Sequence, residues 1–164
     1  MAELSVSKKN IKDLLNNNKA DFLIPDYQRP YAWDAEKECQ TLWEDVFDFA
    51  FPENDYSNFD TKTAEYYLGP IVTFTNNKKQ SEIIDGQQRL TTFIILVNEI
   101  VSFVRELPEN KGLSDKDIVI GFETLQDVCD KYICKKRPPH GLVTTYLFGY
   151  EVDNPSADYL KYKV

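Results

Sequence analysis

The sequence predicts a mixed α+β domain in which a small sheet leads into a central buried helix that other helices surround. A β-hairpin pattern over residues 66–84 runs directly into a long amphipathic pattern over residues 87–107. Helical patterns at residues 7–17, 34–50 and 118–132 flank this pair. No internal repeat or low-complexity tract interrupts the order, so we expect all 164 residues to form one domain, a fragment of a longer protein.

The N-terminal part of the chain predicts a helix, a strand, a loop and a second helix. The helix over residues 7–17 ends at a run of asparagines, and Asp21–Ile24 is predicted to be a short strand. Two prolines exclude a regular helix from Pro25–Trp33, so we expect an ordered loop there. Asp34 is a suitable N-cap for the helix that ends near residue 50. The apolar stripe that we expect to face the core consists of Cys39, Leu42, Trp43, Val46, Phe47 and Ala50.

A hairpin is predicted to deliver the chain to the central helix. Residues 52–65 are polar and acidic, which is typical of a surface loop. Strands are predicted for Tyr66–Thr75 and Gln80–Ile84, with a turn between them. Pro108 closes the helix that follows. Its apolar residues recur every three or four positions and are Leu90, Phe93, Ile94, Val97, Ile100, Val101 and Val104.

The C-terminal part predicts one more helix, a strand and a short terminal helix. Ser114–Asp117 resembles a cap for a helix over residues 118–132, which the basic run Lys135–Arg137 and two prolines then end. A strand is predicted for Leu142–Tyr150. A turn after it starts a helix through Leu160.

Composition excludes several classes of function. The formal net charge of −8 disfavours binding to DNA or to an anionic membrane through a broad basic surface. Three cysteines and a single histidine are too few for a His/Cys metal cluster, and they fit reduced thiols in a cytoplasm. No signal peptide or membrane-spanning stretch is present in the sequence, so we expect a cytoplasmic protein with no membrane partner.

The junction between the hairpin and the central helix has the chemistry of a phosphate-binding corner. Gly86 lets the backbone approach a ligand closely, and the first turn of the helix offers unpaired N–H groups. Arg89 adds a fixed cation, and Asp85 adds a carboxylate able to hold Mg²⁺ or a water molecule. The residues with matching chemistry in the proline-rich loop are Tyr27, Gln28, Arg29, Tyr31 and Trp33. Together these cations, amides and aromatic rings suit a nucleotide.

Purely structural explanations remain open for the same residues. Asp85 can be a helix cap with Gly86 only turning the chain, and Arg89 can pair with a carboxylate. Tyr31 and Trp33 can be core aromatics that cover the sheet. The basic run fits the solvated C-terminus of a helix better than it fits a DNA-binding patch.

Three blocks of this sequence resemble the DUF262 family, the N-terminal domain of GmrSD-type modification-dependent restriction proteins. The blocks are Phe22–Trp33, Tyr67–Ile71 and Ile84–Thr92, and they occur in the order of the family. The resemblance implies a small fold related to ParB and sulfiredoxin. It also implies binding and hydrolysis of a nucleoside triphosphate (NTP), usually with Mg²⁺, coupled to cleavage of modified or phage DNA.

The resemblance also sets limits on the chemistry. Gln87 and Gln88 stand where a sulfiredoxin would need a thiol, so a sulfinic-acid reductase is not expected. The chain lacks the histidine and metal ligands of an HNH-type nuclease. DNA cleavage is therefore expected in a C-terminal nuclease region or subunit, and contact with DNA is expected through the full-length protein.

We consider three functions. The leading hypothesis is a Mg²⁺-dependent, NTP-hydrolysing regulatory domain of an anti-phage restriction protein, with Asp85 as the metal ligand. The second is a non-enzymatic module that senses DNA or its modification, and the third is a structural domain with a capped helix. In the leading hypothesis the catalytic residues are Asp85, Gln87, Gln88 and Arg89. Its nucleotide-binding residues are Tyr27, Gln28, Arg29, Trp33, Gly86, Thr91 and Thr92.

Overall fold

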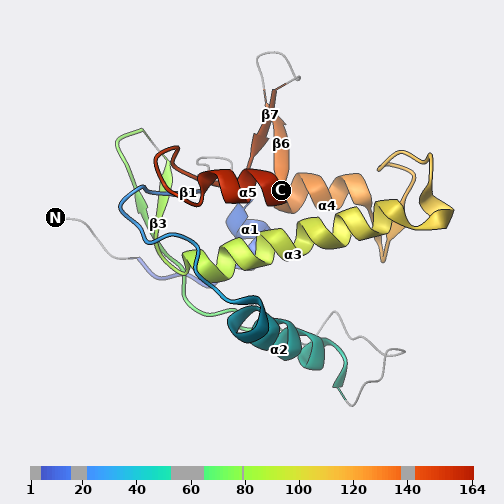
Figure 1. Ribbon diagram of the computed structural model, residues 1–164, viewed down its shortest axis with the longest axis horizontal. Coiled ribbons are helices and arrows are strands. Elements are labelled where there is room, and N and C mark those ends of the chain that lie inside the picture. The colour runs from blue at the N-terminus through green and yellow to red at the C-terminus, as the bar shows by residue number, and fades with distance from the viewer. Residues whose placement is uncertain (1–4, 16–21, 53–64, 79, 138–142) are drawn as a thin grey trace.

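A four-stranded mixed sheet forms one layer of the fold, as Figure 1 shows in part. The computed structural model describes residues 5–15, 22–52, 65–78, 80–137 and 143–164. The strand order is β2 (Val72–Thr75), β3 (Ser81–Asp85), β1 (Phe22–Ile24) and β8 (Phe148–Tyr150). β1 pairs in parallel with β3 and β8, whereas β2 and β3 form the predicted antiparallel hairpin. The mixed α+β class predicted from the sequence is therefore confirmed.

The long helix α3 (Gln87–Glu106) runs across the molecule, with the helices α4 and α5 packed along it (Figure 1). The other helical elements are α1 (Ile11–Leu15), a π-helical turn (Ala35–Cys39), α2 (Gln40–Ala50), a 3₁₀ turn (Pro108–Asn110), α4 (Leu125–Tyr132) and α5 (Ala157–Lys163). Two further hairpins pair β4 (Val119–Ile120) with β5 (Glu123–Thr124) and β6 (Cys134–Arg137) with β7 (Val143–Tyr146). The β6–β7 hairpin projects away from the helices.

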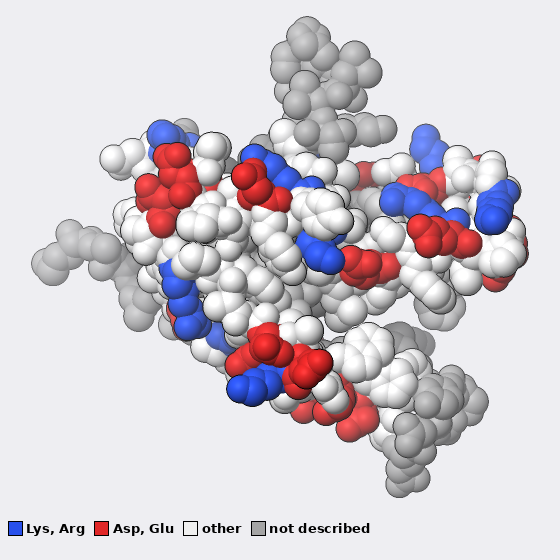
Figure 2. All heavy atoms as spheres, viewed as in Figure 1, with Lys and Arg blue, Asp and Glu red and all other residues white. Residues whose placement is uncertain are grey.

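The surface seen in this view carries mixed charge. Figure 2 shows basic and acidic side chains interspersed over the helices, with no broad field of positive charge. This agrees with the negative net charge of the chain.

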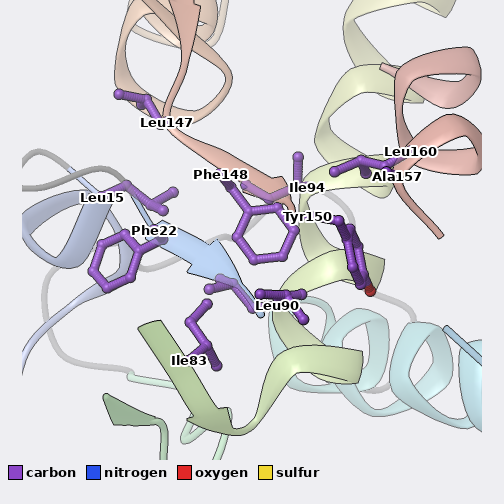
Figure 3. Packing of buried hydrophobic residues seen from close by; sticks show 11 residues of the cluster. Leu15, Phe22, Ile83, Leu90, Ile94, Leu147, Phe148, Tyr150, Ala157 and Leu160 are labelled. Atoms are coloured by element: carbon purple, nitrogen blue, oxygen red, sulfur yellow. The ribbon is translucent and has the colours of Figure 1, made fainter. Parts of the chain in front are cut away.

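The main core lies where one face of the sheet meets α3 and α5. Alternate residues of β1 and β8 are buried, as the two-residue period of a strand requires, and Ile83 of β3 joins them. Leu90 and Ile94 supply the matching apolar face of α3 (Figure 3). The buried members of this cluster are Leu15, Phe22, Ile24, Ile83, Leu90, Ile94, Leu147, Phe148, Tyr150, Ala157 and Leu160.

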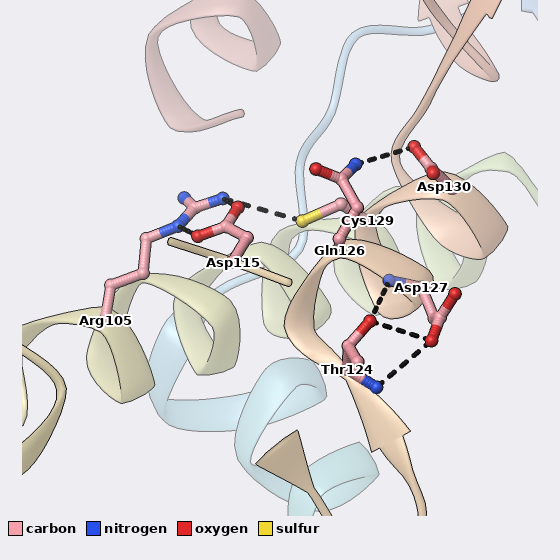
Figure 4. A network of polar contacts seen from close by, with 7 residues as sticks. All are labelled: Arg105, Asp115, Thr124, Gln126, Asp127, Cys129 and Asp130. Atoms are coloured by element: carbon pink, nitrogen blue, oxygen red, sulfur yellow. Dashed lines mark hydrogen bonds and ion pairs between the residues drawn. The ribbon is translucent and has the colours of Figure 1, made fainter. Parts of the chain in front are cut away.

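A second cluster of buried apolar residues joins the far end of α3 to α4. Polar contacts secure it at its edge (Figure 4). Arg105 donates from Nε and Nη2 to the two carboxylate oxygens of Asp115, at 2.9 and 2.6 Å, and Nη2 also lies 3.5 Å from the Cys129 sulfur. The guanidinium lowers the pKa of Asp115, while burial raises the pKa of the Cys129 thiol. At the start of α4, Thr124 and Asp127 form a capping box.

The predicted helix over residues 118–132 is wrong in its first half. The helix begins at Leu125, because Thr124 caps it and the preceding residues form the β4–β5 hairpin. Gly121 turns that hairpin with φ of +63°, a conformation that a helix does not contain. Phe122, which the helical spacing places on the core face, is 97% exposed.

Several other boundaries also differ from prediction. The basic run Lys135–Arg137 belongs to strand β6 instead of ending a helix, and Leu147 divides the predicted strand Leu142–Tyr150 into β7 and β8. Leu147 donates a backbone hydrogen bond to the Ile133 carbonyl and accepts one from the Phe22 N–H, and its side chain is buried in the main core. Of the strand predicted for Tyr66–Thr75, only Val72–Thr75 forms a strand, which is β2.

The predicted apolar face of α2 is right in direction but only partly buried, because Leu42 is buried while Cys39, Val46, Phe47 and Ala50 are half-buried. Trp43 is 46% exposed. The loop predicted for residues 52–65 lies almost entirely outside the described residues. The helix predicted over residues 7–17 begins later than expected, at Ile11, because residues 7–10 are not helical, and its last two residues lie outside the described residues. The ordered loop at Pro25–Trp33, the Asp34 cap and the central helix are confirmed.

Candidate functional site

Gly86 makes a sharp turn between β3 and α3 and is the N-cap of that helix. Its φ of +89° favours glycine, and an added Cβ would lie 3.0 Å from the Pro70 carbonyl oxygen. No side chain caps the helix, so the interpretation of Asp85 as its cap is wrong. Among the described residues, none accepts a hydrogen bond from the backbone N–H groups of Gln87, Gln88 or Arg89. The first turn of α3 therefore keeps unsatisfied donors at the positive end of the helix dipole.

Arg89 holds the segment before β2 against this helix start. Its Nη1 donates to the Leu68 carbonyl at 2.9 Å, and its Nη2 donates to the Pro70 carbonyl at 2.8 Å. Gly69, between them, has φ of +104°. The expected carboxylate partner is thus replaced by two backbone carbonyls. A guanidinium has five N–H donors, so three remain for a ligand.

The two glutamines of the motif hold the proline-rich loop. Gln88 is 5% exposed, and both ends of its amide are used. Its Oε1 accepts from the Ala32 N–H at 2.8 Å, and its Nε2 donates to the Pro30 carbonyl at 3.0 Å. Gln87 donates from Nε2 to Oε1 of Gln28 at 3.2 Å. The structure therefore brings all three sequence blocks together at the start of α3.

The two threonines that follow the motif differ in position. Thr91 is fully buried, and its hydroxyl lies 2.9 Å from the Tyr150 hydroxyl, which places it in the core below the corner. Thr92 donates to the Gln88 carbonyl and lies 2.9 Å from the Tyr31 hydroxyl.

Tyr31 is packed as a structural residue. Its ring stacks on Tyr159 with centroids 5.7 Å apart, and its hydroxyl also lies 3.3 Å from the Cys39 sulfur. Burial raises the pKa of the Tyr31 phenol, which therefore stays protonated at neutral pH. Trp33, at the end of the same loop, is half-buried. The interpretation of Tyr31 as a core aromatic agrees with these contacts.

Three predicted site residues are exposed around the corner. The side chains of Asp85 and Arg29 make no hydrogen bond or ion pair with any residue that the structure describes. Tyr27 is 66% exposed and donates from its hydroxyl to Glu82 at 3.1 Å. Partial desolvation, followed by the Glu82 carboxylate, raises the pKa of Tyr27. Asp85 and Arg29 are thus a carboxylate and a cation available to a ligand.

Sequence reasoning missed a group of residues that follows β8. Asn154 donates to the carbonyls of Pro25 and Gln28, and Ser156 accepts from the Tyr31 N–H. The turn-forming sequence Asn-Pro-Ser signals a bend in the chain. It carries no signal that the bend would hold a loop more than a hundred residues away, because that contact is tertiary.

Ligand chemistry at the corner is limited by the residues present. No three His, Cys, Asp or Glu side chains gather into a metal site within the described part of the chain. A Mg²⁺ ion needs only one or two protein carboxylates when phosphates and water complete its shell, so Asp85 fits the metal of a nucleotide complex.

Within the same described residues, no helix is long and apolar enough to cross a membrane.

The comparison with protein families agrees with the three sequence blocks. The family described as GmrSD restriction endonuclease, N-terminal domain, matches residues 11–156. No curated protein matches the chain. The matched range contains the proline-rich loop, the Arg89-bound segment and the α3 corner, together with Asn154 and Ser156. The chain therefore belongs to the GmrSD N-terminal domain family, which places it in DNA restriction.

Proposed function

We propose that the corner at the start of α3 binds a nucleoside triphosphate with Mg²⁺ and hydrolyses it, as the regulatory part of a DNA restriction protein. One observation carries the proposal. Three separate sequence blocks converge on an uncapped helix N-terminus, where free N–H groups and exposed charges meet. In this proposal, DNA cleavage belongs to a nuclease region or subunit beyond these residues.

The phosphates would be bound by backbone and cations together. The N–H groups of Gln87 and Gln88 suit the phosphate oxygens, and Arg89 contributes the donors that its backbone contacts leave unused. Arg29 is exposed and supplies a second cation from the proline-rich loop. The exposed ring of Tyr27 and the half-buried Trp33 are the aromatic surfaces offered to a base.

Asp85 and Gln87 are the residues for the hydrolytic step. When bound, Mg²⁺ would neutralise charge on the phosphates, with the Asp85 carboxylate as its protein ligand. Gln88 cannot also orient the attacking water, because both ends of its amide already bind the loop. Gln87 uses only its Nε2 on Gln28, so its Oε1 is the acceptor left to orient the water. Arg89 then serves two purposes, holding the Leu68–Pro70 segment and binding phosphate.

The test is turnover of ATP, GTP, CTP and UTP by full-length protein, with Mg²⁺ and with or without modified DNA. We expect Asp85→Asn, which removes the carboxylate that would hold Mg²⁺, to lower kcat roughly 100-fold, the upper end of the loss caused by changing even an outer-shell partner of a metal. Asp48→Asn changes an exposed carboxylate on α2 by the same chemistry and should leave turnover unchanged.

Two results would overturn this proposal. One is absence of binding and hydrolysis of every NTP by the wild-type protein with Mg²⁺. The other is equal turnover by Asp85→Asn and wild type. Binding of modified DNA without any nucleotide effect would instead support the DNA-sensing module.

A further inference from the structure

The segment that follows β8 also holds the proline-rich loop, through hydrogen bonds separate from those of α3. Asn154 is 2% exposed, and its side-chain amide makes three hydrogen bonds. Its Nδ2 donates to the Pro25 carbonyl at 3.0 Å and to the Gln28 carbonyl at 3.2 Å, while its Oδ1 accepts from the Ser156 N–H at 3.0 Å. A buried amide whose nitrogen and oxygen are both hydrogen-bonded fixes its surroundings, because breaking these bonds leaves buried polar groups unpaired.

Two more contacts extend this hold along the loop. Ser156 Oγ accepts from the Tyr31 N–H at 2.7 Å, and the Glu151 carboxylate accepts from the Asp26 N–H at 3.0 Å. The anchored atoms lie on both sides of Arg29. Two groups of residues therefore hold the loop by hydrogen bonds, namely the glutamines of α3 and the residues after β8.

We infer that Asn154 and Ser156 are positioning residues that present Gln28 and Arg29 at the start of α3. Their effect on the loop stands on the hydrogen bonds alone, while their effect on turnover rests on the proposed nucleotide function. Neither side chain touches the corner directly, since both bind backbone groups of the loop. Asp85 and Gln87 belong to β3 and α3, outside the loop, so loosening the loop should weaken nucleotide binding more than it slows the hydrolytic step.

The experiment combines hydrogen-deuterium exchange with kinetics on the full-length protein. Asn154→Asp keeps the side-chain shape and the acceptor for Ser156, and it replaces the doubly donating nitrogen with an oxygen. We expect the loop amides that are hydrogen-bonded in the structure to exchange about tenfold faster, since local opening sets their protection. These amides belong to Asp26, Gln28, Tyr31 and Ala32.

Asn98→Asp is the matched control. Asn98 donates from Nδ2 to the Lys163 carbonyl at 2.8 Å, so the change removes the same kind of bond and adds the same charge away from the loop. Exchange over residues 25–33 should stay at the wild-type rate in this control. Should Asn154→Asp fail to fold, Ser156→Ala removes only the acceptor for Tyr31, and Ser156→Thr should restore it.

Nucleotide kinetics separate this inference from the proposed function. Turnover is measured with Mg²⁺ and with ATP, GTP, CTP or UTP, whichever the wild type hydrolyses. We expect Asn154→Asp to raise the KM for that nucleotide about tenfold, with kcat within twofold of the wild-type value. Unchanged loop exchange in both Asn154→Asp and Ser156→Ala would overturn the inference. Faster exchange with an unchanged KM would overturn the link to the nucleotide. If the wild type turns over no NTP, the proposed function fails, and exchange alone decides whether Asn154 holds the loop.

Discussion

Gly69→Ala is the sharpest test of how the corner is built. A Cβ added at Gly69 would lie 1.7 Å from Nη1 of Arg89, a distance at which one of the two groups must move. The guanidinium would then lose its bonds to the carbonyls of Leu68 and Pro70. Separately, φ of +104° strains any residue that carries a Cβ.

Two costs add in this variant. The backbone strain costs about 1–2 kcal/mol, and the weakened bonds of a half-buried cation cost about 1.5 kcal/mol, the low end for charged donors. Together they lower the free energy of unfolding by about 3 kcal/mol. Alanine also restricts the unfolded chain, which offsets roughly 0.5 kcal/mol, so we expect a net fall of about 2.5 kcal/mol.

Gly112→Ala is the matched control, because Gly112 has φ of +85° and nothing within 4 Å of an added Cβ. It carries the strain and the unfolded-state effect without the clash. Urea unfolding of both variants gives the difference, for which we expect about 1.5 kcal/mol. In an Arg89→Ala background the clash disappears, so Gly69→Ala should then cost no more than Gly112→Ala. Equal costs for the two alanines in the wild-type background would refute the proposed arrangement of Arg89.

Three further predictions concern stability. Thr124→Ala removes the N-cap of α4 and should lower the free energy of unfolding by about 1 kcal/mol, measured by urea unfolding, whereas no change would contradict the capping box. The pKa of Asp115 is lowered by Arg105, so the ion pair stabilises the fold above the unfolded pKa of about 4 and this stability is lost as pH falls through the lower folded pKa. Wild type should therefore have a higher Tm than Asp115→Asn at pH 7, with the gap closing in acid; a gap independent of pH would refute this. Tyr31→Phe removes a hydroxyl that contacts Thr92 and Cys39, and we expect a loss of about 1 kcal/mol in the same unfolding assay, with an unchanged midpoint as the contradicting result.

The central helix could be predicted from the sequence because its signals agree with one another. Apolar residues recur at helical spacing over twenty residues, Gly86 precedes the helix and Pro108 follows it. The helix α4 shows the opposite case. Ile118, Phe122 and Leu125 are spaced as on a helix, yet Gly121 permits a hairpin turn and Phe122 points to solvent. A short apolar spacing does not distinguish a helix from two strands joined by a glycine.

The location of the candidate site could be predicted, but the contacts of its side chains could not. Each block contains polar groups in a loop or at a helix start, which local sequence shows. Which group then binds a ligand and which binds the protein depends on distant segments. Arg89 meets carbonyls about twenty positions earlier in the chain, and Gln88 meets a loop nearly sixty positions earlier. Only the folded chain fixes those distances.

Some residues of the corner hold another segment by hydrogen bonds and others are exposed, and this difference decides which variants can test function. Gln88 and Arg89 each hold another segment, so changing either alters the shape of the corner and its charge together. Loss of turnover in such a variant would not separate binding from folding. Asp85 and Arg29 are exposed and have no side-chain hydrogen-bonding partner among the described residues. Removing their charges therefore leaves the hydrogen bonds of Gln88 and Arg89 to the other segments in place. If Asp85→Asn and Arg29→Gln unfold at the wild-type urea midpoint and lose turnover, the loss is chemical, and the corner is a ligand site as well as a structural junction.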